Sequence, residues 1–240
     1  MSAASLDSRV SAIRTVALVG PAGAGKTLLL DALLAHAGVI PQAGSIERGS
    51  TVSDHDPLER RLGHSLQSSL AHFTHGGVRI HAIDTPGAPD FVGQALPALE
   101  AADTAIVVIN AQNGIELMAQ RMLAAARERW LTRLIVVNRI DCPDVDLPGL
   151  LAQIREVFGK ECLPLNLPAN GAQRVADCFF AASGEADFSS VAEAHRALVE
   201  QVVEVDDDEP REPPLARRGQ HALRHQLDAV LRVDDNDGRV

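Results

Sequence analysis

One eight-residue segment constrains this chain more than any other. Residues 20–27 read Gly-Pro-Ala-Gly-Ala-Gly-Lys-Thr, which fits the pattern G-x-x-x-x-G-K-[ST]. An apolar run at 15–19 precedes the segment, and a helix-forming stretch at 27–36 follows it. This strand–loop–helix context favours a phosphate-binding loop over a glycine-rich turn that merely joins two elements. Glycines let the backbone close around an anion, and successive N–H groups at a helix N-terminus face its oxygens. The predicted phosphate-binding residues are Gly20, Pro21, Ala22, Gly23, Ala24, Gly25, Lys26 and Thr27.

Two of these residues have specific expected roles. Lys26 would reach the β- and γ-phosphates, and the Thr27 hydroxyl would bind Mg²⁺. The chain has only two lysines, Lys26 and Lys160, among its 22 basic residues. A sequence that otherwise uses arginine keeps lysine where a compact charge fits better than a planar guanidinium. This lysine usage argues against a plain turn. We predict that Lys26 is a catalytic as well as a phosphate-binding residue.

The composition fits a single globular domain. The chain has 240 residues, of which 46% are hydrophobic and 3% aromatic, so a core of Ala, Leu, Val and Ile is expected. The net charge of −10 argues against general binding to DNA or to anionic membranes. The three cysteines lie far apart with no metal-ligand spacing, and no apolar run approaches 18 residues. We expect a soluble, cytoplasmic protein with buried or idle thiols.

The order of the elements predicts an α/β fold. Strands alternate with helices, which indicates a doubly wound, mostly parallel sheet with one antiparallel hairpin strand. The expected strands are 15–19, 65–74, 78–84, 104–110 and 134–138, and the expected helices are 27–36, 91–101, 115–130, 147–158 and 189–205. Residues 37–64 form a long connection without periodicity, and such connections are usually functional or disordered. We expect a polar leader at 1–14, the main domain at 15–208 and a poorly ordered tail at 209–240.

Two further motifs follow predicted strands. Asp84 and Gly87, in Asp84-Thr85-Pro86-Gly87, are spaced to hold Mg²⁺ through water and to donate a backbone N–H to a γ-phosphate; a plain turn is the alternative. Asn138-Arg139-Ile140-Asp141 places a carboxylate that can accept two hydrogen bonds from guanine. Adenine lacks that donor pair, so it would leave a polar group unpaired. The alternative here is a polar strand-to-helix loop.

Together the three motifs resemble those of the translational GTPases, most closely elongation factor G and its paralogues. Residues 83–91 resemble that family's IDTPGHxDF, and residues 138–141 its NKxD. The likeness covers roughly 15–208 and implies a P-loop NTPase G domain that binds GTP or GDP with Mg²⁺. It also implies a ribosome partner, although the domains with which that family contacts the ribosome do not follow in this sequence. The implied nucleotide-binding residues outside 20–27 are Asp84, Thr85, Pro86, Gly87, Ala88, Asn138, Arg139, Ile140 and Asp141, with Gly87 catalytic.

The metal-binding hydroxyl of the switch I loop has two candidates. Residues 47–51 superficially resemble the family's ERGIT, which would nominate Thr51. In the family this residue can precede the DTPG aspartate by about nineteen positions, one β-hairpin, and Ser65 precedes Asp84 by nineteen. We therefore predict Thr27, Ser65 and Asp84 as the metal residues.

The chain departs from the family pattern in three respects. Ala88 stands where the family has a histidine that orients water, so hydrolysis should be slow. Arg139 replaces a lysine, and its guanidinium can stack on a purine as well. The family's fifth guanine-contacting motif, a Ser-Ala pair, should come after residue 208, and this sequence does not contain it there. The leading hypothesis is a GTPase of weak activity. The alternatives are a non-catalytic, nucleotide-dependent switch or scaffold and a decayed remnant.

Overall fold

A five-stranded sheet forms the centre of the molecule. The computed structural model describes residues 12–53 and 56–207. The strands are β1 (Ile13–Val19), β2 (Ser69–His75), β3 (Val78–Asp84), β4 (Thr104–Asn110) and β5 (Thr132–Asn138). Their order in the sheet is β2-β3-β1-β4-β5, with only β2 antiparallel to its neighbour. The predicted α/β fold with one antiparallel hairpin strand is confirmed.

Helices cover both faces of this sheet, with α2 (Lys26–His36) on one face and α4 (Val92–Ala101) and α5 (Leu117–Glu128) on the other. The other described helices are α3 (Pro57–Leu62), α6 (Leu147–Phe158) and α7 (Val191–Asp207), and a 3-10 turn η1 (Pro89–Phe91) precedes α4. Every residue of β4 is buried, as a continuous apolar run predicts for a central parallel strand. Alternate β4 residues face opposite cores: Val107 packs with α4 and α5, whereas Val108 packs with α2.

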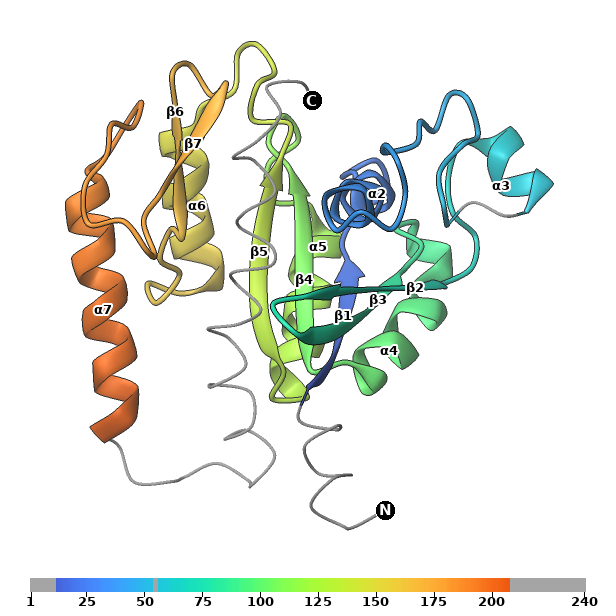
Figure 1. Ribbon diagram of the computed structural model, residues 1–240, viewed down its shortest axis with the longest axis horizontal. Coiled ribbons are helices and arrows are strands. Elements are labelled where there is room, and N and C mark those ends of the chain that lie inside the picture. The colour runs from blue at the N-terminus through green and yellow to red at the C-terminus, as the bar shows by residue number, and fades with distance from the viewer. Residues whose placement is uncertain (1–11, 54–55, 208–240) are drawn as a thin grey trace.

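The parallel strands end at one edge of the sheet, and the predicted motifs follow them there. The phosphate-binding loop at residues 20–27 (the P-loop) follows β1. The motif at residues 84–87 (the Asp84 motif) begins at the end of β3, and the motif at residues 138–141 (the Asn138 motif) begins at the end of β5. Such an edge is where open α/β sheets bind ligands. Figure 1 shows α2 starting at this edge and α3 standing beyond the β2 side.

A second, smaller unit follows α6 in the chain. Strands β6 (Asn166–Ala169) and β7 (Arg174–Asp177) form an antiparallel hairpin, and α7 covers it. Its core includes Leu167, Cys178 and Leu198. The helix α7 was predicted from the sequence, but the hairpin was missed. Asn170 and Gly171 at its turn both have positive φ, 56° and 66°, which is typical of a tight hairpin turn.

Two other differences from the expected elements lie near the site. The first strand of the main hairpin begins at Ser69, not at residue 65, so Ser65 lies in the loop before it. The long connection at 37–64 contains α3, which was not predicted. The predicted leader and tail fall mostly on residues 1–11 and 208–240, outside the described residues. None of the helices described in the structure combines the length and apolar character needed to cross a membrane.

Candidate nucleotide and metal site

The P-loop has the backbone that its glycines permit. Gly20 has φ 134°, and a Cβ at that position would overlap the Val108 carbonyl oxygen. Gly25 has φ 94° and forms the N-cap of α2, where a Cβ would overlap the side-chain amide of Asn138. Two of the motif's glycines are therefore required by φ and by the close approach of neighbouring strands. The loop leads directly into the N-terminus of α2, whose N–H groups can face an anion.

Lys26 is buried at the centre of this loop. Its Nζ donates hydrogen bonds to the carbonyl oxygens of Gly20, at 3.0 Å, and Pro21, at 2.8 Å. Burial lowers the pKa of Lys26 from 10.5 to about 8, and the charges of Asp84 and Glu116 oppose that shift. The ammonium is thus held among loop carbonyls in a dry environment, where its attraction for a phosphate is strong.

Four hydroxyl and carboxylate groups meet beside Lys26. Thr27 Oγ1 donates to Asp84 Oδ2 at 2.6 Å, and Ser53 Oγ donates to the same oxygen at 3.0 Å. Ser65 Oγ lies 3.5 Å from Thr27 Oγ1. The structure thus brings the three predicted metal residues together, and it adds Ser53. Thr51, the other candidate for the switch I hydroxyl, is also buried and precedes Ser53 by two positions.

This donor set suits a hard cation. Mg²⁺ prefers oxygen ligands at about 2.0–2.1 Å in octahedral geometry, so neighbouring ligand oxygens lie about 3 Å apart. The 3.5 Å between the Thr27 and Ser65 hydroxyls is close to that spacing. Asp84 is almost fully buried and lies against Thr27, which suits a carboxylate that acts through a water. Among the described residues there is no cluster of three or more His, Cys, Asp or Glu side chains that could hold a different kind of metal.

The Asp84 motif packs against the P-loop. A Cβ on Gly87 would overlap Lys26 Nζ and the backbone nitrogen of Ala22, so only glycine lets the two loops approach this closely. Thr85 Oγ1 donates to the Leu18 carbonyl oxygen at 2.7 Å, and this fixes the start of the motif on β1. Pro86 is buried, and Ala88 is half-buried with only a methyl side chain.

The Asn138 motif is tied to the P-loop. Asn138 Nδ2 donates to the Ala24 carbonyl oxygen at 2.9 Å, and Asn138 Oδ1 accepts from the Arg139 backbone N–H at 2.9 Å. Arg139 has φ 59° and is exposed, Ile140 is half-buried, and Asp141 is exposed. The Arg139 and Asp141 side chains, which a nucleotide base could contact, therefore lie at the exposed rim of the site.

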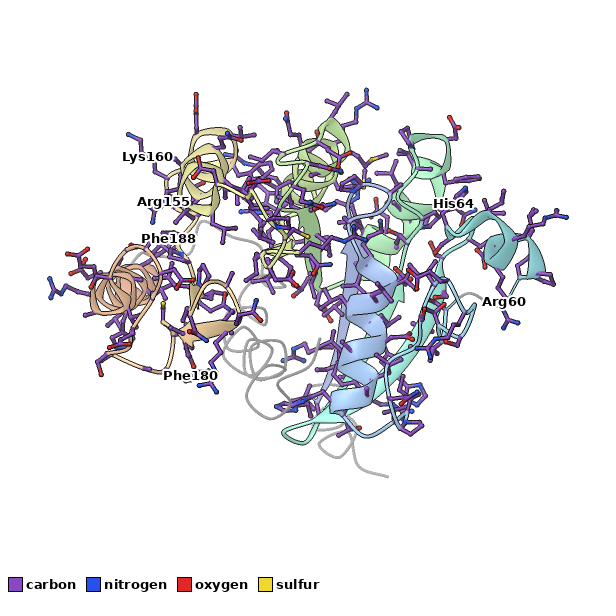
Figure 2. The ribbon with its side chains drawn as sticks, turned by 90° about the horizontal axis from the view of Figure 1, so that it is seen from above. Arg60, His64, Arg155, Lys160, Phe180 and Phe188 are labelled. Atoms are coloured by element: carbon purple, nitrogen blue, oxygen red, sulfur yellow. The ribbon has the colours of Figure 1, made fainter. Side chains whose placement is uncertain are left out.

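Three functional candidates could not be picked out from the sequence: Ser53, Asp31 and Glu59. Ser53 shares the Asp84 carboxylate with Thr27. Asp31 and Glu59 are both buried and accept backbone N–H groups from the connection between α2 and β2. The one available signal was that Asp31 is a charged residue among the leucines of α2. His64 is exposed in the bend after α3, and Figure 2 shows it on the same side of the molecule as Arg60. His55 lies outside the described residues.

Comparison with known proteins identifies the family. The family model described as "Elongation factor Tu GTP binding domain" matches residues 11–225. The chain belongs to this family of translational GTPase G domains. An elongation factor G-like protein of Mycobacterium tuberculosis is 33% identical over 208 residues, which cover 82% of this chain and 29% of that protein. Peptide chain release factor 3 of Listeria monocytogenes is 29% identical over 233 residues, which cover 95% of this chain and 42% of that protein.

A solved structure supports the same family. A crystal structure of a Thermus thermophilus protein superposes with a TM-score of 0.72 at 29% identity, covering 93% of this chain and 35% of that one. The chain thus spans less than half the length of the relatives that it matches. The comparison concerns their G domains only.

Proposed function

We propose that this G domain binds GTP and GDP with Mg²⁺ and hydrolyses GTP slowly. The observation that carries the proposal is the meeting of the Thr27, Ser65 and Asp84 oxygens beside the buried Lys26 ammonium. An ammonium and a magnesium site side by side are what the β- and γ-phosphates of a nucleotide require. In this proposal Thr27 and Ser65 bind Mg²⁺ directly, and Asp84 binds it through water.

The other motifs complete the nucleotide site. Gly87 lies against Lys26 and Ala22, a position from which its N–H can reach a γ-phosphate. Asn138 links the base-binding loop to the P-loop. Asp141 is proposed to accept the two guanine N–H groups, with the Arg139 guanidinium over the purine. The ribosome is the expected partner, in line with the release factor and elongation factor names of the relatives.

A specificity change tests the guanine assignment. The Asp141→Asn variant replaces one acceptor with an amide donor, so GTP binding should weaken at least tenfold, as for the loss of a charged hydrogen bond. Xanthosine nucleotides present a carbonyl where guanine has its amino group, and their relative affinity should rise. Asp144→Asn, a change at another exposed aspartate of the same loop, is the matched control. Unchanged GTP affinity in Asp141→Asn contradicts the assignment.

A non-catalytic switch is the second candidate function. Ala88 favours it, since a methyl side chain cannot orient the attacking water in the family's way. In that case GTP binding orders the connection between α2 and β2, and a partner recognises the ordered form. Single-turnover measurement of phosphate release, with and without ribosomes, separates the two. Release in either condition supports the slow GTPase, and release in neither supports the switch.

A further inference from the structure

Two buried carboxylates outside the nucleotide motifs contact the same connection. Asp31 is in the middle of α2, and Glu59 is in α3. Asp31 is fully buried and Glu59 is 5% exposed. The connection that they contact, residues 44–53 and 56–67, contains Ser53 and Ser65, whose hydroxyls lie in the cluster of oxygens around Asp84 and Thr27. A buried carboxylate is costly unless its oxygens accept hydrogen bonds, so the partners of these two groups indicate what they do.

Asp31 holds the first half of the connection. Its Oδ2 accepts from the Gly44 N–H at 2.9 Å, and its Oδ1 accepts from the Val52 N–H at 3.1 Å. A Cβ on residue 44 would lie 2.6 Å from Asp31 Oδ2, so the contact requires glycine there. Val52 is directly followed by Ser53, whose hydroxyl donates to Asp84. Asp31 therefore fixes the backbone next to one hydroxyl of the cluster.

Glu59 holds the second half in the same way. Its Oε1 accepts from the N–H groups of Leu66, at 2.7 Å, and Gln67, at 3.1 Å. Its Oε2 accepts from the Asp56 N–H at 3.4 Å, which closes a capping box at the start of α3. Leu66 directly follows Ser65, whose Oγ lies 3.5 Å from Thr27 Oγ1. Glu59 thus fixes the backbone next to the other hydroxyl.

The two halves also contact each other. The methylene groups of Arg60, in α3, lie over Gly49, and a Cβ added to that glycine would be 3.4 Å from them. Apart from the six residues of α3, the connection has no helix or strand among its described residues. Ordering a residue costs about 1–2 kcal/mol in backbone entropy. The carboxylates supply buried acceptors whose hydrogen bonds offset part of this cost.

We propose that Asp31 and Glu59 are positioning residues, which present Ser53 and Ser65 to the magnesium ion of the GTP-bound state. This inference rests on the proposed function. Both carboxylates act through backbone that is adjacent to a cluster hydroxyl, and neither touches nucleotide. Losing either one leaves the P-loop and the Asn138 motif intact. The effect therefore falls on binding that depends on Mg²⁺ and the γ-phosphate, and GDP binding is spared.

The isosteric variant Glu59→Gln provides the test. Gln removes the charge and keeps only one acceptor oxygen, so its NH₂ group must face either the Leu66 and Gln67 N–H groups or the Asp56 N–H. In titrations with Mg²⁺, affinity for a non-hydrolysable GTP analogue should fall about tenfold, as for one lost charged hydrogen bond. Affinity for GDP should change less than about twofold by the same reasoning. Glu156→Gln, an exposed change on α6, is the matched control and should alter neither.

A double-mutant cycle tests whether Glu59 acts through Ser65. In a Ser65→Ala background, Glu59→Gln should add no further loss of GTP-analogue affinity, because the hydroxyl that it positions is gone. The Asp31→Asn and Ser53→Ala pair should behave likewise. Hydrogen exchange in the nucleotide-free protein is a direct readout: the Leu66 and Gln67 amides should exchange faster in Glu59→Gln than in wild type.

The outcomes separate this inference from the proposed function. An unchanged ratio of GTP-analogue to GDP affinity in Glu59→Gln overturns the inference. An equal loss of both affinities, with a lowered melting temperature, also overturns it, because that pattern is merely structural. If the wild-type chain binds neither nucleotide with Mg²⁺, the proposed function fails and the inference falls with it.

Discussion

The burial of Lys26 should affect the free energy of unfolding of the protein as well as its binding of nucleotide. Its pKa falls from 10.5 to about 8 when the chain folds. At about 1.36 kcal/mol per pKa unit, the buried ammonium costs the nucleotide-free protein about 3 kcal/mol at neutral pH. Lys26→Met removes this cost and also removes two hydrogen bonds to loop carbonyls, worth about 1 kcal/mol each. Lys26→Met should therefore abolish nucleotide binding and stabilise the nucleotide-free protein by about 1 kcal/mol at pH 7.

The pH dependence gives the sharper signature. The folded pKa lies below the unfolded one, so above pH 8 the unfolded chain binds more protons than the folded chain. The cost of Lys26 is present in full below pH 8 and fades as pH rises toward 10.5. Wild type should thus gain about 2 kcal/mol relative to Lys26→Met between about pH 7 and pH 9.5. Titrations common to both proteins cancel in the difference.

Urea unfolding of the nucleotide-free proteins over this pH range is the assay. Lys160→Met removes the chain's other lysine, which is exposed, and is the matched control. Its free energy of unfolding should run parallel to that of wild type. A wild-type-minus-Lys26→Met difference that stays flat with pH would refute the argument that Lys26 is desolvated in the loop.

Three further predictions concern other parts of the molecule. Ala88→His should raise single-turnover GTP hydrolysis by about 10²-fold or more, the usual scale of a positioned acid–base group, without changing GDP affinity; an unchanged rate would mean that more than this residue is missing. Asn138→Ala deletes the hydrogen bond to the Ala24 carbonyl and should weaken GDP binding about tenfold in fluorescence titrations, and an unaltered affinity would show that the loops do not need this link. Leu198→Ala empties a buried position of the β6–β7 and α7 core and should cost about 2–5 kcal/mol in urea unfolding; a cost below about 1 kcal/mol would show a loosely packed unit.

The sheet could be predicted well from the sequence because its signals are local. The β4 segment is a nearly continuous apolar run. Each phosphate-binding or base-binding motif directly follows a strand, so the motifs indicate where β1, β3 and β5 end. Ser65 was chosen over Thr51 from the length of one hairpin, and the structure places its hydroxyl beside Thr27.

The missed features depend on contacts that are distant in sequence or on weak local signals. Strands β6 and β7 have four residues each, and Pro168 interrupts the alternating pattern of the first, so the Asn170-Gly171 turn lacks clear flanking strand signals in the sequence. Ser53, which donates to Asp84, directly follows Val52, whose N–H donates to Asp31 across 21 positions of the chain. No periodicity or sequence motif indicates these contacts, because they depend on which backbone N–H groups lie within reach of one buried carboxylate in the folded chain.

The measurement that tests the central claim most directly is a titration with fluorescent GDP and with a fluorescent ATP analogue in the presence of Mg²⁺. It should be made on the chain as it stands and on Lys26→Ala. The account predicts tight, saturable binding of GDP, much weaker binding of the ATP analogue, and loss of both in the variant. Absence of GDP binding by the unaltered chain, or equal binding of the two nucleotides, would contradict it.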